Sequence, residues 1–148
     1  MKKGITIIAA IALIAFLGFA FTSKKEAVKS DKSGIEFFNG TWQEALTLAK
    51  KENKLIFLDA YAAWCGPCKM MANSIFVKQE AGNFYNKNFI NYKMDMEKHK
   101  DGPRLARKYG LTAYPTLYIV NTNEEIAKAS VGYLDLQKLL HFGKSAIQ

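Results

Sequence analysis

The stretch AYAAWCGPCKMM, residues 60–71, contains both cysteines of the 148-residue chain, Cys65 and Cys68. A near-continuous apolar run, KLIFLDAY (residues 54–61), leads into it, as expected of a central strand that is covered on both faces. The residues that follow, GPCKMMANSIF (66–76), have the pattern of a helix, which tolerates a proline in its first turn. The stretch therefore predicts a strand that ends in a cysteine loop and continues into a helix.

The position of Cys65 between strand and helix indicates a reactive thiol. Unpaired backbone N–H groups and the positive end of the helix dipole both favour the thiolate, which lowers the pKa of the thiol. One helical turn brings Cys68 within bonding distance of Cys65, so Cys68 can attack a mixed disulfide formed at Cys65 and release the product. Pro67 stiffens the loop at a position where no N–H bond is lost. The pair is therefore a candidate redox couple in which Cys65 attacks and Cys68 resolves.

Two other interpretations of the cysteine pair remain open. A structural metal site usually needs four ligands, and one C-x-x-C motif supplies two. The two histidines, His99 and His141, lie far along the chain without the spacing of metal ligands. A purely structural pair is the other alternative, although a bridge across a four-residue loop would restrain little of the unfolded chain. The sequence favours the redox role and predicts no metal site.

The first 22 residues predict a signal peptide or an N-terminal membrane anchor. Lys2 and Lys3 precede an uncharged apolar run of 17 residues, residues 5–21. Signal peptides have an apolar core of about 7 to 15 residues, and spanning helices need about 17 to 25. A small-x-small triplet, Gly18-Phe19-Ala20, lies inside the apolar run. Cleavage and anchoring through residues 5–21 both remain open, and a buried core helix is the less favoured alternative. Export to the periplasm or cell envelope follows from the basic residues that precede the run.

The rest of the chain divides into a linker and one domain. Residues 23–34 are charged and small and lack apolar periodicity, which is typical of a flexible tether. Residues 35–148 are long enough for a single core, and the chain is 49% hydrophobic and 13% aromatic.

The net charge of +8 indicates a basic surface and does not by itself predict a nucleic-acid partner. The lysines are scattered as pairs and single residues, and no aromatic residues alternate with them as a stacking platform for bases requires. We therefore expect no nucleic-acid partner.

Periodicity and turn signals predict the remaining elements. TWQEALTLAKKEN (41–53) begins with a capping box formed by Thr41 and Glu44. Asp101 is a candidate cap for the helix that ends at Gly110. The predicted order is β-α-β-α-β-α-β-β-α, with the first strand on the short apolar stretch IEFF, and it indicates an α/β domain with a central mixed sheet flanked by helices. The other predicted elements are helices over 78–88, 101–110 and 135–148 and strands over 89–96, 115–121 and 125–132.

The motif WCGPCK, preceded by Asp59 and followed by the Tyr-Pro-Thr of residues 114–116, resembles the active-site region of the thioredoxin family. The resemblance spans residues 35–148 and implies the thioredoxin fold and a protein-disulfide oxidoreductase. The phrases LDAYAAWC and KMMANSIF are similar to the periplasmic C-terminal domain of the thiol:disulfide interchange protein DsbD. Tyr61 stands where cytoplasmic thioredoxins have a tryptophan, which favours this exported branch.

The resemblance also implies roles for single residues. Asp59 matches a buried aspartate that accepts a proton from Cys68 during resolution, and burial would raise its pKa to suit that task. Its alternative is a strand-end residue satisfied by local hydrogen bonds. Pro115 matches a cis-proline that faces the cysteines, where the backbone of the preceding residue pairs with an extended client segment. An ordinary trans proline at a strand edge is the alternative.

A set of substrate-binding residues is implied in the same way. Trp64 matches one wall of the client groove, and a core position is the alternative. Gly132 matches a glycine that lets a partner chain approach closely. Lys93 matches a lysine near the aspartate, although it could equally point to solvent. The substrate-binding residues implied by the resemblance are Trp64, Gly66, Pro67, Tyr114, Pro115 and Gly132.

The sequence as a whole therefore predicts an exported oxidoreductase that reduces disulfides of other exported proteins through Cys65 and Cys68. It needs no cofactor besides that redox-active pair, and a membrane electron donor would have to reduce the pair again. The alternative function is a module that binds copper or an unfolded client without turnover.

Overall fold

The structure, a computed structural model, describes residues 34–147. The predicted export segment and residues 23–33 of the predicted linker lie outside this range. Within the described range, four strands form one mixed sheet in the order β2-β1-β3-β4, in which β1 and β2 are parallel and the other neighbours are antiparallel. The strands are β1 (Leu55–Tyr61), β2 (Phe89–Asp95), β3 (Thr116–Val120) and β4 (Ile126–Val131).

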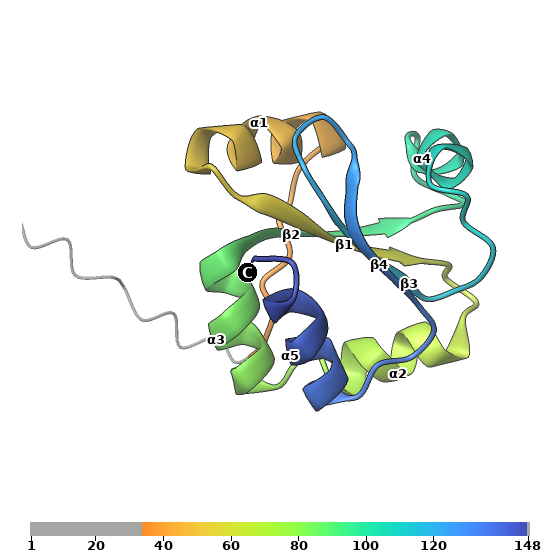
Figure 1. Ribbon diagram of the computed structural model, residues 1–148. Helices are drawn as coiled ribbons and strands as arrows, with labels where there is room; N and C mark the ends of the chain where they lie inside the picture. The colour runs from red at the N-terminus through yellow and green to blue at the C-terminus, as the bar shows by residue number, and fades with distance from the viewer. Residues whose placement is uncertain (1–33, 148) are drawn as a thin grey trace, which may run out of the picture.

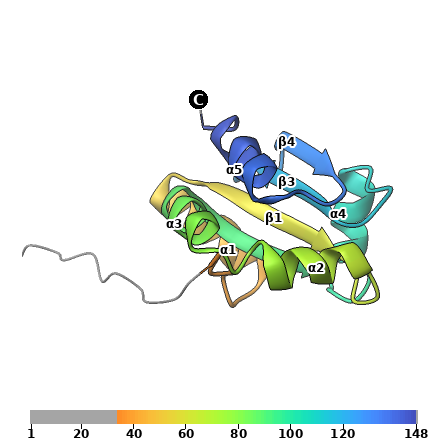
Figure 2. The same cartoon turned by 90° about the horizontal axis from the view of Figure 1, so that it is seen from below.

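Five helices cover the two faces of the sheet in the described residues. Helices α1 and α4 lie on one face of the sheet, and α2, α3 and α5 lie on the other (Figure 1). Figure 2 shows the molecule from below. Each face has its own apolar core. None of the helices within residues 34–147 has both the length and the apolar character needed to cross a bilayer. The helices are α1 (Trp42–Glu52), α2 (Gly66–Ser74), α3 (Gln79–Asn88), α4 (Gly102–Lys108) and α5 (Leu136–Lys144).

Strand β1 is apolar along nearly its whole length because both of its faces are covered. Successive side chains of a strand point to opposite faces. Ile56 and Leu58 pack in the core under α1 and α4, whereas Phe57 packs in the core with α2, α3 and α5. Asp59 therefore lies on the same face as Phe57, toward α2. The alternation places one carboxyl group on the side of the sheet that carries the cysteines.

Helix α1 forms as the capping box predicts. The hydroxyl oxygen of Thr41 accepts a hydrogen bond from the backbone N–H of Glu44 at 3.2 Å, and the Glu44 carboxylate accepts one from the backbone N–H of Thr41 at 2.7 Å. The face of α1 that packs on the sheet carries Trp42, Ala45, Leu46 and Ala49, all buried.

The first predicted strand is absent, because residues 35–38 form no strand. The backbone N–H of Phe38 donates to the carbonyl of Asn91 in β2 at 2.7 Å. Side-chain amides make the neighbouring contacts: Asn86 accepts from the N–H of Glu36, and Asn91 donates to the Glu36 carbonyl. Side-chain amides thus take the place of a backbone ladder, and the segment lies beside the edge of β2 without joining the sheet.

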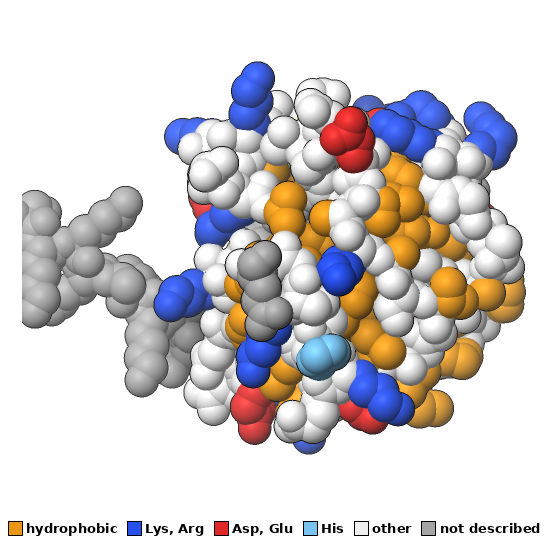
Figure 3. Space-filling view, in the orientation of Figure 1, with side chains coloured by type: hydrophobic (Ala, Val, Ile, Leu, Met, Phe, Trp, Pro, Cys, Tyr) orange, Lys and Arg blue, Asp and Glu red, His pale blue; other side chains and the backbone are white. Residues whose placement is uncertain are grey.

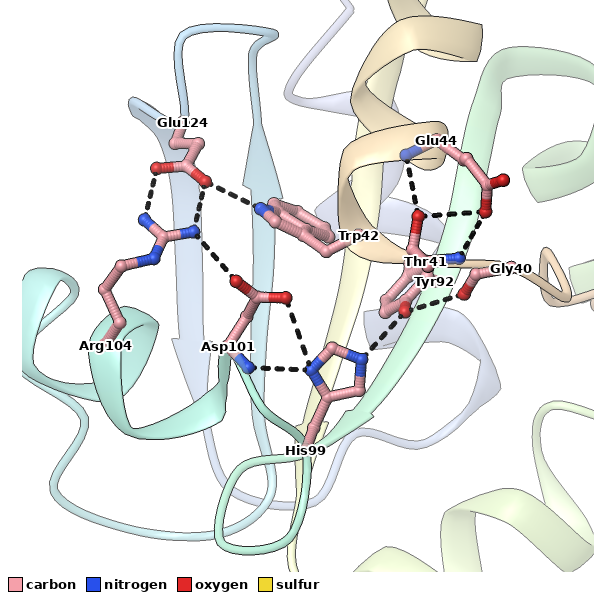
Figure 4. Close-up of polar contacts among 9 residues, drawn as sticks. All are labelled: Gly40, Thr41, Trp42, Glu44, Tyr92, His99, Asp101, Arg104 and Glu124. Carbon is pink, nitrogen blue, oxygen red and sulfur yellow. Dashed lines mark hydrogen bonds and ion pairs between the residues drawn. The ribbon is translucent and has the colours of Figure 1, made fainter.

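Asp101 does not cap α4 as predicted. It directly precedes the helix, but its side chain accepts no capping hydrogen bond and its backbone is already in the helical region. The carboxylate instead lies 3.8 Å from His99 Nδ1 and 3.6 Å from Arg104 (Figure 4). Gly110 has a φ of +61° just past the helix, in the left-handed conformation that glycine adopts at helix ends.

Gly82 lies inside α3 because another chain segment approaches the helix at that point. A Cβ at residue 82 would collide with the backbone of Gly34. The carbonyl of Gly34 in turn accepts a hydrogen bond from Asn86 Nδ2 at 3.0 Å. This close approach explains why a residue with poor helix propensity occupies the middle of a helix.

The face of the molecule shown in Figure 3 carries apolar side chains in a central band, with lysine and arginine side chains dispersed around it. The basic residues on this face do not gather into one stripe.

Candidate active site

The cysteine loop lies where the ends of all four strands of the described sheet meet. Parallel pairing places the ends of β1 and β2 side by side, since Tyr61 pairs with Asp95. Antiparallel pairing brings the start of β3 to the same edge, where Thr116 pairs with Ala60 of β1 and with Val131 of β4. The segments that follow β1, β2 and β4 and the one that precedes β3 therefore meet at one edge of the sheet. Loops far apart in the sequence form one site there.

Cys65 is the N-cap residue of α2, and its sulfur lies at the helix N-terminus. Cys65 and Cys68 form a disulfide, and Sγ of Cys65 accepts a hydrogen bond from the backbone N–H of Cys68 at 3.1 Å. Both cysteines are largely buried, with exposed fractions of 2% and 5%. Backbone N–H groups and the helix dipole at this position stabilise a negative sulfur after reduction. The predicted placement of Cys65 at the junction between strand and helix is confirmed.

Asp59 lies buried beneath the cysteine loop, with 5% of its surface exposed. Burial raises the pKa of its carboxyl group to about 7, and the positive charge of Lys93 partly opposes this rise. Asp59 and Lys93 are register partners on β1 and β2. A pocket of about 180 Å³ joins this carboxyl group to the second cysteine and to solvent; its lining is Asp59, Tyr61, Ala62, Ala63, Cys68, Lys69, Ala72 and Lys93.

The side chain of Lys93 is exposed, and it lies beside the site. It lines the same pocket as Asp59 and Cys68. Its Nζ atom lies 5.6 Å from the centroid of the Phe37 ring. The strand therefore places this lysine on the face of Asp59, with its charged end near the Phe37 ring.

The segment before β3 packs against the cysteines. The peptide bond between Tyr114 and Pro115 is cis, and Pro115 is buried. Tyr114 packs against the small cluster formed by Ala62 and the two cysteines. The carbonyl of Pro115 accepts a hydrogen bond from the backbone N–H of Gly132 at 2.8 Å. The structure thus brings Tyr114, Pro115 and Gly132 together beside the disulfide.

Gly132 combines an unusual backbone with an open surface. Its φ is +93°, which other residues rarely adopt. Apart from Gly132 itself and its two chain neighbours, no atom of the described residues lies within 4 Å of the place where a Cβ would stand. The backbone conformation therefore explains the glycine, and the surface above it is free for a partner chain.

Trp64 is not a core residue, so that alternative is wrong. Its side chain is 68% exposed, and its ring packs edge-on against Tyr114 with the centroids 5.7 Å apart. The indole N–H donates to both carboxylate oxygens of Glu97, at 3.2 and 3.0 Å. Gly66 and Pro67, at the start of α2, are also exposed. All residues of the implied substrate-binding set thus lie around the disulfide.

Glu97 was missed by the sequence analysis. It lies in the loop after β2, and nothing in its local sequence marks it as part of a site. Its contact with Trp64 depends on the parallel pairing of β1 and β2, which brings the loops after both strands to the same edge. Only the strand order of the sheet could have pointed to it.

A second polar cluster lies around Glu124, in the hairpin between β3 and β4 (Figure 4). Its carboxylate accepts hydrogen bonds from Arg104 at 2.7 and 2.8 Å, from Lys108 at 2.9 Å and from the Trp42 indole at 2.7 Å. These donors, Arg104 first among them, lower the pKa of Glu124 to about 2. The cluster joins the hairpin to α1 and α4.

The same cluster contains one of the two histidines. His99 contacts the Tyr92 hydroxyl at 3.2 Å and accepts a hydrogen bond from the backbone N–H of Asp101 at 3.1 Å. Within residues 34–147, no three histidine, cysteine, aspartate or glutamate side chains are grouped so that they could hold a metal ion.

A disulfide at a helix N-terminus, above a buried carboxyl group and beside a proline loop, defines a thiol-disulfide oxidoreductase in its oxidised form. The fold around it is a mixed four-stranded sheet flanked by helices. Residues 35–145 match the family model named Thioredoxin. The chain belongs to the thioredoxin family.

Individual relatives support this assignment. Thioredoxin H2 from Arabidopsis thaliana is 29% identical over 119 residues, which cover 79% of this chain and 84% of the relative. A solved structure of a candidate disulphide-isomerase from Bacteroides thetaiotaomicron has a TM-score of 0.69 and 40% identity, covering 78% of this chain and 95% of the other. The C-terminal domain of DsbD from Neisseria meningitidis, in its oxidised form, has a TM-score of 0.60 at 23% identity, covering 75% and 99%. That last likeness concerns the fold.

Proposed function

We propose that the protein reduces disulfides of exported client proteins by cycling Cys65 and Cys68 between dithiol and disulfide. The Cys65 thiolate attacks one sulfur of the client disulfide, which forms a mixed disulfide and releases one client thiolate. Cys68 then attacks Cys65 Sγ, which releases the second client thiol and closes the Cys65–Cys68 bond. Two electrons pass from the cysteine pair to the client.

The observation that carries this proposal is the place of Cys65 Sγ, which accepts the Cys68 N–H at the N-terminus of α2. Once the disulfide is reduced, this position favours the thiolate over the thiol at Cys65. The thiolate is the nucleophile, so Cys65 is the attacking residue. Cys68 lies inside the first turn of the helix and starts the second step.

In the second step, Cys68 must lose its proton before it attacks. Asp59 lines the same pocket as Cys68, and its pKa of about 7 allows it to accept that proton near neutral pH. The pocket opens toward Lys93, so the proton can then leave to solvent. Asp59 therefore acts as the general base for resolution.

In this proposal, clients bind across the surface residues that surround the disulfide. The backbone on either side of the Tyr114–Pro115 bond pairs with an extended client segment next to its cysteine. Gly132 leaves room for that segment, and Trp64 forms a wall on the other side. Gly66 and Pro67 form the exposed turn that the client crosses.

The proposed location is outside the cytoplasm, in the periplasm or cell envelope. The basic start and uncharged run over residues 5–21 support export and leave anchoring open. Each cycle leaves the cysteine pair oxidised, as it is in the structure. A dithiol protein in the membrane is therefore the proposed electron donor.

The test is a trapping experiment with Cys68→Ser. Without Cys68, the mixed disulfide at Cys65 cannot be resolved, so we expect covalent client adducts that disappear on treatment with a reducing agent. Cys65→Ser is the matched control, because it removes the attacking sulfur and should form few adducts. Non-reducing electrophoresis of exported proteins measures both.

The same variants separate this function from the alternative one. A copper carrier or a non-catalytic client-binding module would yield no covalent adducts with Cys68→Ser, and the copper carrier would lose its ion. Equal adduct levels in the two variants would also contradict the proposed roles of the cysteines.

A further inference from the structure

We propose that the outer edge of β4, together with the groove between β4 and α5, is a docking site for an extended segment of a partner protein with acidic side chains at alternate positions. The segment would pair with β4 as a fifth strand of the sheet. No residue that lines the groove belongs to the catalytic or client-binding residues named above. Docking there therefore does not depend on the proposed sulfur chemistry.

The two edge strands of the described sheet differ in what covers them. At β2, the N–H of Phe38 bonds to the Asn91 carbonyl, so the chain over residues 35–38 lies along that edge. At β4, no segment within residues 34–147 pairs with the outer edge, and five of the six residues are exposed (Figure 2). An uncovered edge strand leaves backbone N–H and C=O groups free to pair with another chain.

The register of β3 and β4 indicates which backbone groups of β4 face outward. The N–H of Gly132 donates to the Pro115 carbonyl, so it points toward β3. Backbone groups alternate between the two sides of a strand in an antiparallel pair, so those of Val131 and Ala129 point outward. The register shifts near the start of β4. The regular part of the outer edge therefore covers residues 128–131.

The groove beside this edge combines an apolar interior with basic side chains. Its volume is about 530 Å³, within the range of about 300–1,000 Å³ that ligand clefts have. Phe142 is buried and Leu134 is half-buried, whereas Lys128, Lys138 and His141 are exposed. Among the residues that line the groove there is no aspartate or glutamate. The groove therefore complements an acidic segment.

Lys128 lies where it can select an acidic partner. It pairs across the sheet with Ile119, which packs in the core beside α5, so the lysine side chain lies on that face. Within residues 34–147 Lys128 forms no ion pair, whereas Lys138 lies 3.4 Å from Asp135. A residue of an added strand directly opposite Lys128 would have its Cβ about 5 Å away. An acidic side chain is attracted there and a basic one is repelled.

The other face of the same edge favours apolar side chains in the partner. Ala129 pairs with Tyr118, which packs in the core under α1 and α4, and Val131 shares that face. Val131 is 61% exposed and Ile126 is 42% exposed. Figure 3 shows apolar side chains gathered in the region of β4. An added strand would remove this apolar surface from water, so the partner segment should alternate acidic and apolar residues.

Charge disfavours two other occupants of this edge. A second copy of the chain has the same net charge of +8, and pairing of two β4 edges would bring two basic grooves together. The chain's own linker has four lysines and two acidic residues over residues 22–33. A separate protein with an acidic extended segment is therefore the occupant that fits.

The binding test uses two labelled peptides with the full oxidised chain: Val-Glu-Val-Glu-Val-Glu-Val and its counterpart with lysine in place of glutamate. Fluorescence anisotropy measures Kd for both. We expect the acidic peptide to bind about tenfold more tightly, because its side chains face Lys128 and Lys138. This preference should shrink between about 20 and 300 mM salt, since salt screens exposed charges.

Three variants test how the peptide is held. Lys128→Glu should weaken binding of the acidic peptide by about three- to tenfold and strengthen binding of the lysine peptide. Lys50→Glu, at an exposed position of α1, is the matched charge reversal and should leave both affinities nearly unchanged. Ala129→Pro removes an outward N–H and no bond to β3, so it should weaken binding by about tenfold.

Amide hydrogen exchange measured by NMR locates the bound peptide and needs no variant. The acidic peptide should slow exchange of the Ala129 and Val131 N–H groups with water. The N–H of Ser130 points toward β3 and should change little. Protection of alternate residues is the signature of an added strand, whereas a peptide held by charge alone would leave these N–H groups exchanging freely.

Equal binding of the two peptides, or exchange protection confined to another surface, would overturn the docking site. Equal losses of affinity in Lys128→Glu and Lys50→Glu would also overturn it, because the basic surface would then act without selecting a place. If the protein alone sediments as a dimer in which Ala129 and Val131 are already protected, a second copy occupies the edge and the acidic partner is wrong.

Discussion

Two carboxyl groups in this molecule are largely removed from solvent, and their pKa values move in opposite directions. Asp59 is 5% exposed, and its pKa is raised to about 7. The side chain of Glu124 is 14% exposed, and its pKa is lowered to about 2. The difference lies in the partners that the fold supplies to each.

Glu124 is surrounded by donors that favour its charged form. Arg104, Lys108 and the Trp42 indole all bond to it. At Asp59 the dominant effect is burial, which favours the neutral acid, and the charge of Lys93 offsets only part of it. The carboxylate of Glu124 joins parts of the fold, whereas the carboxyl group of Asp59 can exchange its proton near neutral pH. Burial alone therefore does not tell whether an acidic residue is structural or functional.

The largest expected effect is on stability, from Asp59→Asn at alkaline pH. The raised pKa means that the folded protein binds a proton that the unfolded chain has lost, so the wild-type loses stability as pH rises from about 4 through about 7. The asparagine variant has no such loss. We expect it to be more stable than wild-type at pH 9, by on the order of 4 kcal/mol, and nearly equal at pH 4.

Urea unfolding of the oxidised protein at both pH values measures this effect. A variant that is less stable than wild-type at pH 9 would show that the Asp59 carboxylate is well stabilised by its surroundings. The two carboxyl groups would then be alike.

The second effect is also on stability, but here removing the charge of a carboxylate destabilises the protein. Replacing Glu124 by Gln removes the charge that Arg104 and Lys108 pair with, and keeps the shape of the side chain. We expect a loss of about 1–2 kcal/mol at pH 7, moderated because both basic partners are partly exposed. The lowered pKa stabilises the fold above the ordinary pKa of a glutamate, and this contribution disappears as pH falls through about 2.

Chemical unfolding at pH 7 and at pH 2 provides the comparison. The gap between wild-type and Glu124→Gln should close at the lower pH, where the wild-type glutamate also becomes neutral. If the stability difference between wild-type and Glu124→Gln were the same at pH 7 and pH 2, it would come from a disturbed packing of the hairpin and not from the lost charge.

The smallest effect concerns Lys93, which links the pocket of Asp59 to solvent. Lys93→Met removes the positive charge that lowers the pKa of Asp59, so this pKa should rise further. The alkaline loss of stability should then move to higher pH. Lys128→Met, an exposed lysine on β4, is the matched control and should leave the pH of this transition unchanged. If the pH dependence of stability were the same for Lys93→Met and Lys128→Met, solvent would screen the charge of Lys93 from Asp59.

The sequence predicted the elements whose cause is local. The capping box of Thr41 and Glu44, the apolar run of β1 and the glycine after α4 each depend on neighbours within a few residues. The cysteine loop belongs to the same class, because the N-terminus of a helix forms from the residues that surround it. Residues 35–38 were predicted wrongly because the side-chain amides of Asn86 and Asn91, distant in the sequence, hold this segment. Asp101 was predicted wrongly because its carboxylate contacts its sequence neighbours His99 and Arg104 instead of the helix N–H groups.

Residues were assigned to the site by resemblance to a family, and the fold brings them to one place. The sequence alone could not decide whether Trp64 lies in the core or at the surface, or whether Lys93 faces the pocket. Both depend on strand register and on which loops meet at the edge of the sheet. The same register explains why Glu97 was missed.

The sequence by itself determined that two cysteines share the first turn of a helix after a buried strand, since chain connectivity and helix geometry dictate it. Only the tertiary structure decided that a carboxyl group lies buried beneath them, that Glu97 reaches Trp64, and that Glu124 is surrounded by basic groups. The physical reason is distance along the chain: these groups meet through the pairing of strands and the packing of helices, and a pKa or a hydrogen bond depends on every group that the fold brings near.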